Sequence, residues 1–263
     1  MISIIIVNYN TYKLTCECIK SIIEKTIGIN YEIILVDNAS DECEPERFKE
    51  NFPAITLIKS SINLGFAKGC NLGILNSKGT YILLINSDVK LLNNAILYCY
   101  KKLISDTTIG CVTCNIVLQN GNMQYNCEAF PNFWKIIFQK LRINHLFPLK
   151  YKSKIFLGHN ADYSNDIITE WAHGTFLLFE KNKILKDTKL NENYFMYVED
   201  MKWCWDINKL GYKIVYHHKG KILHYWNGSK NTHNICYYNN NLMHFIFNHY
   251  TKLHYLLLRF LML

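Results

Sequence analysis

The first ninety residues alternate continuous apolar runs with segments of helical periodicity. Each apolar run is short and rich in Ile, Leu and Val, as expected for strands that are buried on both faces of a parallel sheet. Between the first two runs, Leu14, Cys18 and Ile22 recur at helical spacing. The expected strands cover residues 3–7, 31–36, 55–58 and 81–85, and the expected helices cover residues 11–26 and 44–51. This order predicts an α/β fold, with a Rossmann-like, mostly parallel central sheet and helices on both faces.

Polar residues follow the ends of these expected strands. Asn8, Asp37, Asn63 and Asp88 each stand within a few residues of an apolar run. In open α/β sheets, ligands bind at the carboxyl ends of the strands. The sequence therefore predicts a ligand site at this edge of the sheet.

The second half of the chain is less regular, and Pro131 and Pro148 interrupt it. Helices are expected over residues 93–104, 132–143 and 200–210, strands over residues 110–118, 175–179, 213–216 and 221–225, and a final aromatic-rich helix over residues 235–262. Neither an internal repeat nor a low-complexity linker divides the chain.

Composition limits the class of protein. The 263 residues, 49% of them hydrophobic, are enough for a large core. The net charge of +8 is spread along the chain and suits an anionic partner: phosphate, nucleic acid or an anionic membrane face. Neither a signal peptide nor a run of 18 apolar residues is found, so a spanning helix is not expected. The ten cysteines are interpreted as thiols of a cytoplasmic protein.

Two acidic segments at strand ends are open to two interpretations. Asp88, in Asn86-Ser87-Asp88, offers a carboxylate beside an amide, which suits a hard cation such as Mg²⁺. Asp37 could accept hydrogen bonds from a nucleobase or a ribose hydroxyl. Asn, Ser and Asp are also common in turns and at helix N-caps, so either segment alone could be a simple turn.

A glycine-rich segment covers residues 63–73. Gly65, Gly69 and Gly73 fall every fourth residue, on one face of an expected helix, and would allow close approach to a neighbouring backbone or ligand. Asn63 and Lys68 could donate hydrogen bonds to a diphosphate. The spacing does not match the dinucleotide-binding fingerprint.

Two further candidates lie downstream. Glu199 and Asp200 open an expected helix, where the helix dipole favours acids. A carboxylate there could also act as a general base toward a hydroxyl group. The role of His224 depends on whether a second metal ligand lies near it in the fold.

Taken in order, these segments resemble the family-2 inverting glycosyltransferases with the GT-A fold, and most closely their rhamnosyltransferase-like branch. The resemblance covers roughly residues 1–230. The motifs that carry it are VNYN at 7–10, VDNAS at 36–40, NLGFAKGCN at 63–71, LINSD at 84–88, WAHG at 171–174, EDMKWC at 199–204, and His224 with Gly228 and Ser229.

The resemblance implies a nucleotide-sugar-binding half over residues 1–118, an acceptor half over residues 119–230, and a C-terminal helical segment over residues 231–263. It implies that Asp88 and His224 bind Mg²⁺ or Mn²⁺, and that Asp200 is the catalytic base, with Glu199 as the weaker candidate. The residues implied at the nucleotide sugar are Asn8, Tyr9 and Asp37 at the nucleoside, Asn63, Gly65 and Lys68 along the ribose and diphosphate, Asn86 beside the metal, and Trp171, His173 and Gly174 around the sugar.

The implied activity is transfer of a sugar, with rhamnose as one candidate, from a nucleotide-diphosphate donor to a glycan or lipid-linked acceptor in cell-surface polysaccharide synthesis. No nucleic acid partner is expected. The basic amphipathic segment 132–143 and the C-terminal helix favour peripheral binding to the cytoplasmic face of the inner membrane, although a core or homodimer helix would show the same pattern.

Two other functions stay open at this point. Because Asn86 replaces an acid, the chain could be a catalytically inactive glycosyltransferase-like module that binds nucleotide or glycan. A nucleotidyltransferase would require a Gly-rich phosphate loop near the N-terminus, and residues 8–11 do not form one.

Overall fold

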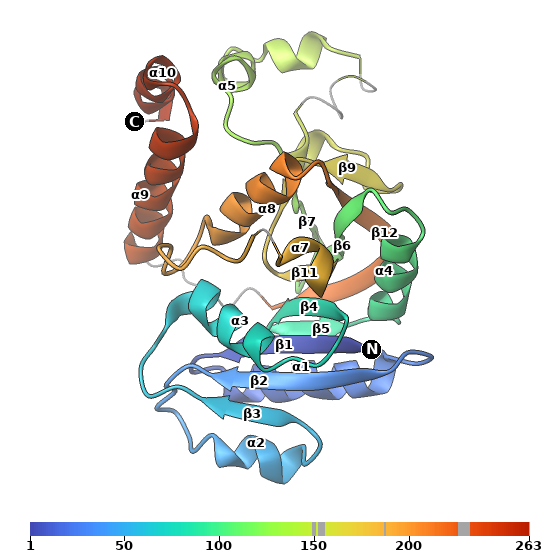
Figure 1. Ribbon diagram of the computed structural model, residues 1–263. Coiled ribbons are helices and arrows are strands. Elements are labelled where there is room, and N and C mark those ends of the chain that lie inside the picture. The colour runs from blue at the N-terminus through green and yellow to red at the C-terminus, as the bar shows by residue number, and fades with distance from the viewer. Residues whose placement is uncertain (149–150, 152–155, 187, 226–231, 263) are drawn as a thin grey trace.

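The computed structural model describes residues 1–148, 151, 156–186, 188–225 and 232–262. Gly228 and Ser229, which contributed to the family resemblance, lie outside the described residues. Figure 1 shows a central sheet with helices on both of its faces.

The central sheet has the strand order β3-β2-β1-β4-β11-β6-β12-β5, with β7 pairing with β6 and β9 with β12. A separate pair is formed by β8 and β10. The strands are β1 (Ile2–Asn8), β2 (Tyr31–Asp37), β3 (Thr56–Lys59), β4 (Tyr81–Asn86), β5 (Val89–Leu91), β6 (Ile109–Leu118), β7 (Met123–Gln124), β8 (Cys127–Glu128), β9 (Ile167–Thr169), β10 (Trp171–Ala172), β11 (Phe176–Glu180) and β12 (Lys213–His224).

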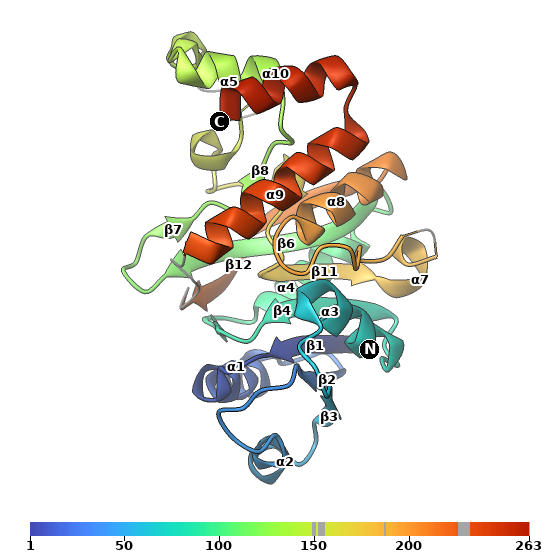
Figure 2. The same cartoon turned by 90° about the vertical axis from the view of Figure 1, so that its left-hand side faces the viewer.

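Helices cover the sheet and extend beyond it. They are α1 (Tyr12–Lys25), α2 (Glu46–Asn51), α3 (Gly65–Leu75), α4 (Ala95–Ile104), α5 (Phe133–Lys140), α7 (Lys181–Ile184), α8 (Glu199–Lys209), α9 (Thr232–His249) and α10 (Lys252–Met262), with short 3-10 turns at Ile143–Leu146 and Gly158–Asn160. Figures 1 and 2 show α5 and α10 side by side at the end of the molecule opposite α2.

The apolar strands separate two hydrophobic cores. Ile4 and Ile6 of β1 face the core that includes α1 and α4, whereas Ile5 faces the core that includes α3, α8 and α9. Because successive side chains of a strand point to opposite faces, both faces must be apolar. Burial of each such Ile contributes about 1.5–3 kcal/mol relative to exposure. The continuous apolar run of β1 is therefore a direct consequence of its place in the middle of the sheet.

The glycine face of α3 packs on β1, as the spacing predicted. A methyl group added at Gly69 would lie 2.9 Å from Val7 Cγ1, and one added at Gly73 would lie 2.5 Å from Ile5 Cγ2. The helix can approach the sheet this closely because these positions lack side chains. The close-packing interpretation of the glycine repeat is confirmed.

The α/β fold class is confirmed, with two differences in the sheet. Parallel pairing holds for β3-β2-β1-β4 and for β6 with β12, whereas β11 is inserted antiparallel between β4 and β6. The two expected strands at 213–216 and 221–225 are one strand, β12, whose register with β6 shifts between His217 and Lys221. The polar segment at this bulge is what made the sequence resemble two strands.

The expected single C-terminal helix over 235–262 is wrong. The chain forms α9 and α10, which are separated at Tyr250 and Thr251. Thr251 Oγ1 accepts a hydrogen bond from His254 N at 3.3 Å, as a residue that caps a new helix does. None of the helices in the described part of the chain has the length and hydropathy required to cross a membrane.

Candidate active site

The predicted residues at the strand ends lie at one edge of the sheet. In the parallel register, Asn8 of β1 pairs with Asp37 of β2, and the neighbouring Val7 pairs with Asn86 of β4. The three segments that end these strands are therefore adjacent. Thr11 Oγ1 lies 2.9 Å from Ser87 Oγ and links the first of these segments to the last.

Asn8 holds this edge together from inside. Its Nδ2 donates to Asp37 Oδ1 at 2.8 Å and to Ser40 Oγ at 2.9 Å, while its Oδ1 accepts from Thr11 and Thr15 hydroxyls at 2.9 and 2.8 Å. Both side-chain atoms are engaged, and the residue is 1% exposed. Asn8 thus fixes the carboxylate of Asp37 in place. Tyr9, which is 47% exposed, lies next to it at the surface of the same edge.

Asn63 and Gly65 belong to a second hydrogen-bond network, at the start of α3. Asn63 Oδ1 accepts from Gly65 N and from Asn38 Nδ2, both at 2.9 Å, and Asn38 Oδ1 accepts from Leu64 N at 2.8 Å. Lys68 is exposed on the first turns of the same helix. This network anchors the start of α3 to the end of β2.

Gly65 has a contact that the sequence did not predict. Its φ is +75°, and an added methyl group would lie 2.2 Å from the carbonyl oxygen of Phe195, which also accepts from Phe66 N at 3.0 Å. The start of α3 therefore holds the loop that leads into Glu199 and Asp200. The predicted place of Gly65 along the ribose and diphosphate stays a prediction.

The structure brings the two predicted metal ligands together. Asp88 Oδ1 lies 3.2 Å from His224 Nε2, and both side chains are largely buried, with 16% and 10% exposed. The pairing of β12 with β5 aligns His224 with Val89, and Tyr225 N donates to the Asp88 carbonyl at 2.9 Å. A sheet register, rather than proximity in sequence, thus forms this pair.

Gln124 orients the ring of His224. Gln124 Oε1 lies 2.6 Å from His224 Nδ1, and an amide oxygen can only accept a hydrogen bond. Nδ1 therefore carries a proton, and Nε2 faces Asp88. Metal-binding histidines are commonly held in this way through their other nitrogen. Gln124 was not predicted, because nothing in its local sequence marks it.

Glu199 and Asp200, at the start of α8, differ in environment. Glu199 is 5% exposed, and burial, together with the neighbouring Asp200, raises its pKa well above the usual range of a carboxyl group. Asp200 is half-buried, and its Oδ2 accepts from Gly174 N at 2.8 Å. The protonated form of Glu199 is favoured, which makes Asp200 the better candidate base of the two.

His173 is influenced electrostatically by both Asp200 and His224. Burial lowers its pKa; Asp200 acts in the opposite direction and His224 in the same direction. Its ring stacks on Trp171 with centroids 5.0 Å apart and an interplanar angle of 19°. A methyl group added at Gly174 would lie 3.2 Å from Phe66 Cε1 and 3.6 Å from Asp200 Cβ. Gly174 thus lies against the candidate base, and Trp171 supports the ring of His173.

The loop before Asp200 is strained. Tyr197 and Val198 have φ angles of +68° and +73°, a region that residues other than glycine rarely adopt, and β-branched residues such as Val least of all. Asn241 of α9 donates through Nδ2 to the carbonyls of Met196 at 2.8 Å and Tyr197 at 3.1 Å. Such strain persists only where the surroundings impose it, and it is frequent at functional sites.

A small cavity of about 110 Å³ lies beside α5, lined by Glu128, Phe130, Lys135, Gln139 and Phe156 among others. Burial raises the pKa of Glu128 to about 7.

The chain matches the family model of glycosyl transferase family 2 over residues 3–179. It is 32% identical over 118 residues to glycosyltransferase GlyG of Streptococcus pneumoniae serotype 4, a match that covers 42% of this chain and 38% of that protein. It is 34% identical over 118 residues to the poly(ribitol-phosphate) beta-glucosyltransferase of Bacillus spizizenii, which covers 41% of this chain and 18% of that protein. In both cases, the match spans less than two fifths of the relative's own length.

Solved structures show the same fold. The mannosyltransferase PcManGT from Pyrobaculum calidifontis, in complex with GDP-Man and Mn2+, superposes with a TM-score of 0.61 at 18% identity, over 89% of this chain and 59% of that one. GalNAc-T7 with UDP, GalNAc and Mn2+ superposes with a TM-score of 0.63 at 14% identity, over 86% of this chain and 44% of that one. The predicted GT-A fold is confirmed, and the chain belongs to glycosyl transferase family 2.

Proposed function

We propose that the chain is an inverting, divalent-metal-dependent hexosyltransferase that moves a sugar from a nucleotide-diphosphate donor to a glycan or lipid-linked acceptor. The observation that carries this proposal is the contact of Asp88 with His224, together with the hydrogen bond from Gly174, the residue after His173, to Asp200. A displacement at one carbon needs one charged group toward the leaving diphosphate and one base toward the acceptor. The relatives support a role in polysaccharide synthesis, since they include a poly(ribitol-phosphate) glucosyltransferase and a chondroitin synthase. Rhamnose is one candidate sugar.

The residues present fit a divalent cation. A carboxylate oxygen and an imidazole nitrogen face each other at 3.2 Å, and Gln124 holds the other nitrogen of the ring. Asp88 and His224 would hold Mg²⁺ or Mn²⁺, with Asn86 nearby in the same segment and donor phosphates completing the shell. A cation bound there stabilises the negative charge that develops on the leaving diphosphate.

Asp200 would take the proton of the acceptor hydroxyl. The acceptor oxygen forms its bond to the anomeric carbon as the bond from that carbon to the diphosphate breaks, and the hydroxyl proton passes to Asp200. Gly174 N–H fixes Oδ2 of Asp200, and the preference of Glu199 for its protonated form makes Glu199 a poor acceptor of this proton. One such displacement inverts the configuration and requires no covalent enzyme intermediate.

The donor would lie along the carboxyl edge of the sheet. Asp37, held by Asn8, would accept hydrogen bonds from the nucleoside, with Tyr9 beside it. Asn63, Gly65 and Lys68 at the start of α3 would lie along the ribose and diphosphate. His173, with its Trp171 and Gly174 neighbours, would border the transferred sugar.

We further propose that the enzyme binds an anionic membrane surface, at the cytoplasmic face of the inner membrane, through α5 and α10. These helices pack together, and they expose Trp134 by 61% and Phe260 by 84%, with Lys140 and Arg259 nearby in sequence. Aromatic and basic side chains together suit a lipid interface. The same faces could serve a homodimer.

Liposome co-sedimentation at low salt tests the membrane surface. Trp134→Ser with Phe260→Ser should release the protein from anionic vesicles. Leu75→Ser is the matched control, because Leu75 is 80% exposed on α3, away from these helices. Equal binding by all three proteins, or a switch from dimer to monomer without any vesicle binding, would refute the membrane proposal.

A donor panel tests the activity. Release of nucleotide from dTDP-, UDP- and GDP-sugars is measured with Mg²⁺ or Mn²⁺ for the wild type, Asp88→Ala and Asp200→Ala. We expect turnover with one donor and its loss in both variants. Turnover that neither variant affects would contradict the mechanism, and nucleotide binding without turnover would point to an inactive binding module.

A further inference from the structure

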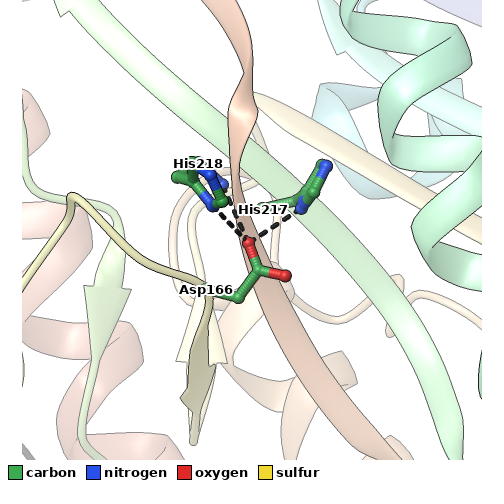
Figure 3. Close-up of side chains that lie close together, drawn as sticks. All are labelled: Asp166, His217 and His218. Atoms are coloured by element: carbon green, nitrogen blue, oxygen red, sulfur yellow. Dashed lines mark hydrogen bonds and ion pairs between the residues drawn. The ribbon is translucent and has the colours of Figure 1, made fainter.

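A second group of ligand-type side chains lies away from Asp88 and His224. Asp166 Oδ1 lies 2.8 Å from His217 Nδ1 and 2.7 Å from His218 Nδ1. Figure 3 shows both rings turned toward this one carboxylate oxygen. The three ligand atoms all lie within 4.8 Å of one another. His217 precedes His224 by seven residues on β12, which separates the two positions by about 20 Å along an extended strand.

The fold places these side chains on paired strands. The antiparallel pairing of β9 with β12 aligns Ile167 with Tyr216, so Asp166 lies at the end of β9 beside the two histidines. Adjacent residues of a strand normally point to opposite faces. Here the register of β12 with β6 shifts just after His217, and bulges of this kind re-aim side chains. The convergence of both rings on one oxygen follows from this irregularity.

A simple ion pair explains only part of the arrangement. Lys102 of α4 lies 3.1 Å from Asp166 Oδ2 and can balance the carboxylate charge by itself. It does not explain why two imidazoles meet at Oδ1. In metal sites, a ligating carboxylate commonly has its other oxygen held by a hydrogen-bond donor, which is the position of Lys102 here.

We propose that Asp166, His217 and His218 bind a borderline divalent cation such as Zn²⁺ through Asp166 Oδ1 and the two Nδ1 atoms. Two imidazoles and a carboxylate, with water in the fourth position, form a common zinc ligand set. Tetrahedral ligands at about 2.0–2.1 Å from the ion lie about 3.3 Å apart, so the side chains need to separate by about 0.5 Å from their present contacts. Each Nδ1 proton moves to Nε2 or is released to solvent. The ion would join β9 to β12 and does not depend on sugar transfer.

Zinc titration calorimetry on untagged protein tests this site. The Asp88→Asn background removes a ligand of the candidate catalytic pair and leaves the second group intact. We expect the Asp88→Asn protein to retain Zn²⁺ binding. Addition of Asp166→Asn should weaken the Zn²⁺ affinity by more than the roughly 10- to 100-fold that outer-shell residues contribute. His218→Ala is a second variant at a half-buried position, in case Asp166→Asn does not fold. His159→Ala is the control, since His159 is exposed and lies outside the group.

Replacement of Zn²⁺ by Co²⁺ supplies a spectroscopic readout. Visible d–d bands of a four-coordinate Co²⁺ ion should appear in the Asp88→Asn and His159→Ala proteins and be absent from Asp166→Asn and His218→Ala. Equal Zn²⁺ affinity in all variants would place the ion elsewhere, for example at cysteine thiols, and would overturn the proposal. Absence of uptake by the Asp88→Asn protein would overturn it as well.

Discussion

The carboxyl group of Glu128 should make the stability of the protein depend on pH in a measurable way. Burial raises its pKa from the ordinary 4.5 to about 7. Between these pH values, the unfolded chain has released the proton of Glu128 while the folded chain retains it. Folding stability therefore falls as pH rises from about 4.5 to about 7, and the loss is complete above the folded pKa.

The size of this effect follows from the shift. A difference between 4.5 and about 7, at about 1.4 kcal/mol per pH unit, corresponds to about 3 kcal/mol. Glu128→Gln removes the ionisable group and keeps its approximate shape. The free energy of unfolding of the variant, relative to that of the wild type, should therefore rise by about 3 kcal/mol between pH 4.5 and pH 8. For a chain of this size, this corresponds to a relative rise in Tm of about 6–12 °C.

Urea unfolding of the wild type and Glu128→Gln at several pH values measures this difference. Other titrating groups cancel in the comparison, because both proteins contain them. Glu24→Gln, an exposed position on α1, controls for the substitution itself. If the difference in free energy of unfolding between the wild type and Glu128→Gln does not change with pH, the carboxyl of Glu128 is solvated. That result would refute the burial argument.

Three other substitutions test separate contacts of the site. In urea unfolding, Gly65→Ala should lower the free energy of unfolding by clearly more than Gly121→Ala. Both residues have positive φ, but only at Gly65 would the added methyl lie 2.2 Å from another atom, the carbonyl oxygen of Phe195. Equal losses in the two variants would show that Phe195 moves freely. Gln124→Leu should raise the Mn²⁺ concentration needed for half-maximal nucleotide release about 10- to 100-fold. An unchanged concentration would show that His224 does not bind the metal. Asn241→Leu should lower kcat with little change in donor KM by freeing the loop before Asp200, and a change confined to KM would contradict this role.

Local sequence patterns were sufficient to predict the fold of the first ninety residues. The strands up to β4 could be predicted because burial on both faces requires continuous apolar runs, and the spacing of Gly69 and Gly73 required a close helix. The antiparallel insertion of β11 could not be predicted, because an apolar strand of five residues has the same pattern in either direction.

Individual residues of the candidate site could be predicted only where they belong to a sequence motif. Asp88 and His224 meet through the register of β5 with β12, which no local pattern encodes. Gln124 and Asn241 act through hydrogen bonds to groups far away in sequence, so nothing near them indicates their contacts. For Asp166, the only available signal was the adjacent histidine pair at 217 and 218.

The assignment of the base can be tested most directly by comparing nucleotide release by Asp200→Asn and Glu199→Gln under the same conditions. Asp200→Asn removes the group that accepts the proton and should lower kcat by about 10²- to 10⁴-fold. Glu199→Gln replaces a carboxyl whose protonated form burial already favours, so its loss should be far smaller. A large loss in Glu199→Gln, with turnover maintained in Asp200→Asn, would contradict the proposed mechanism.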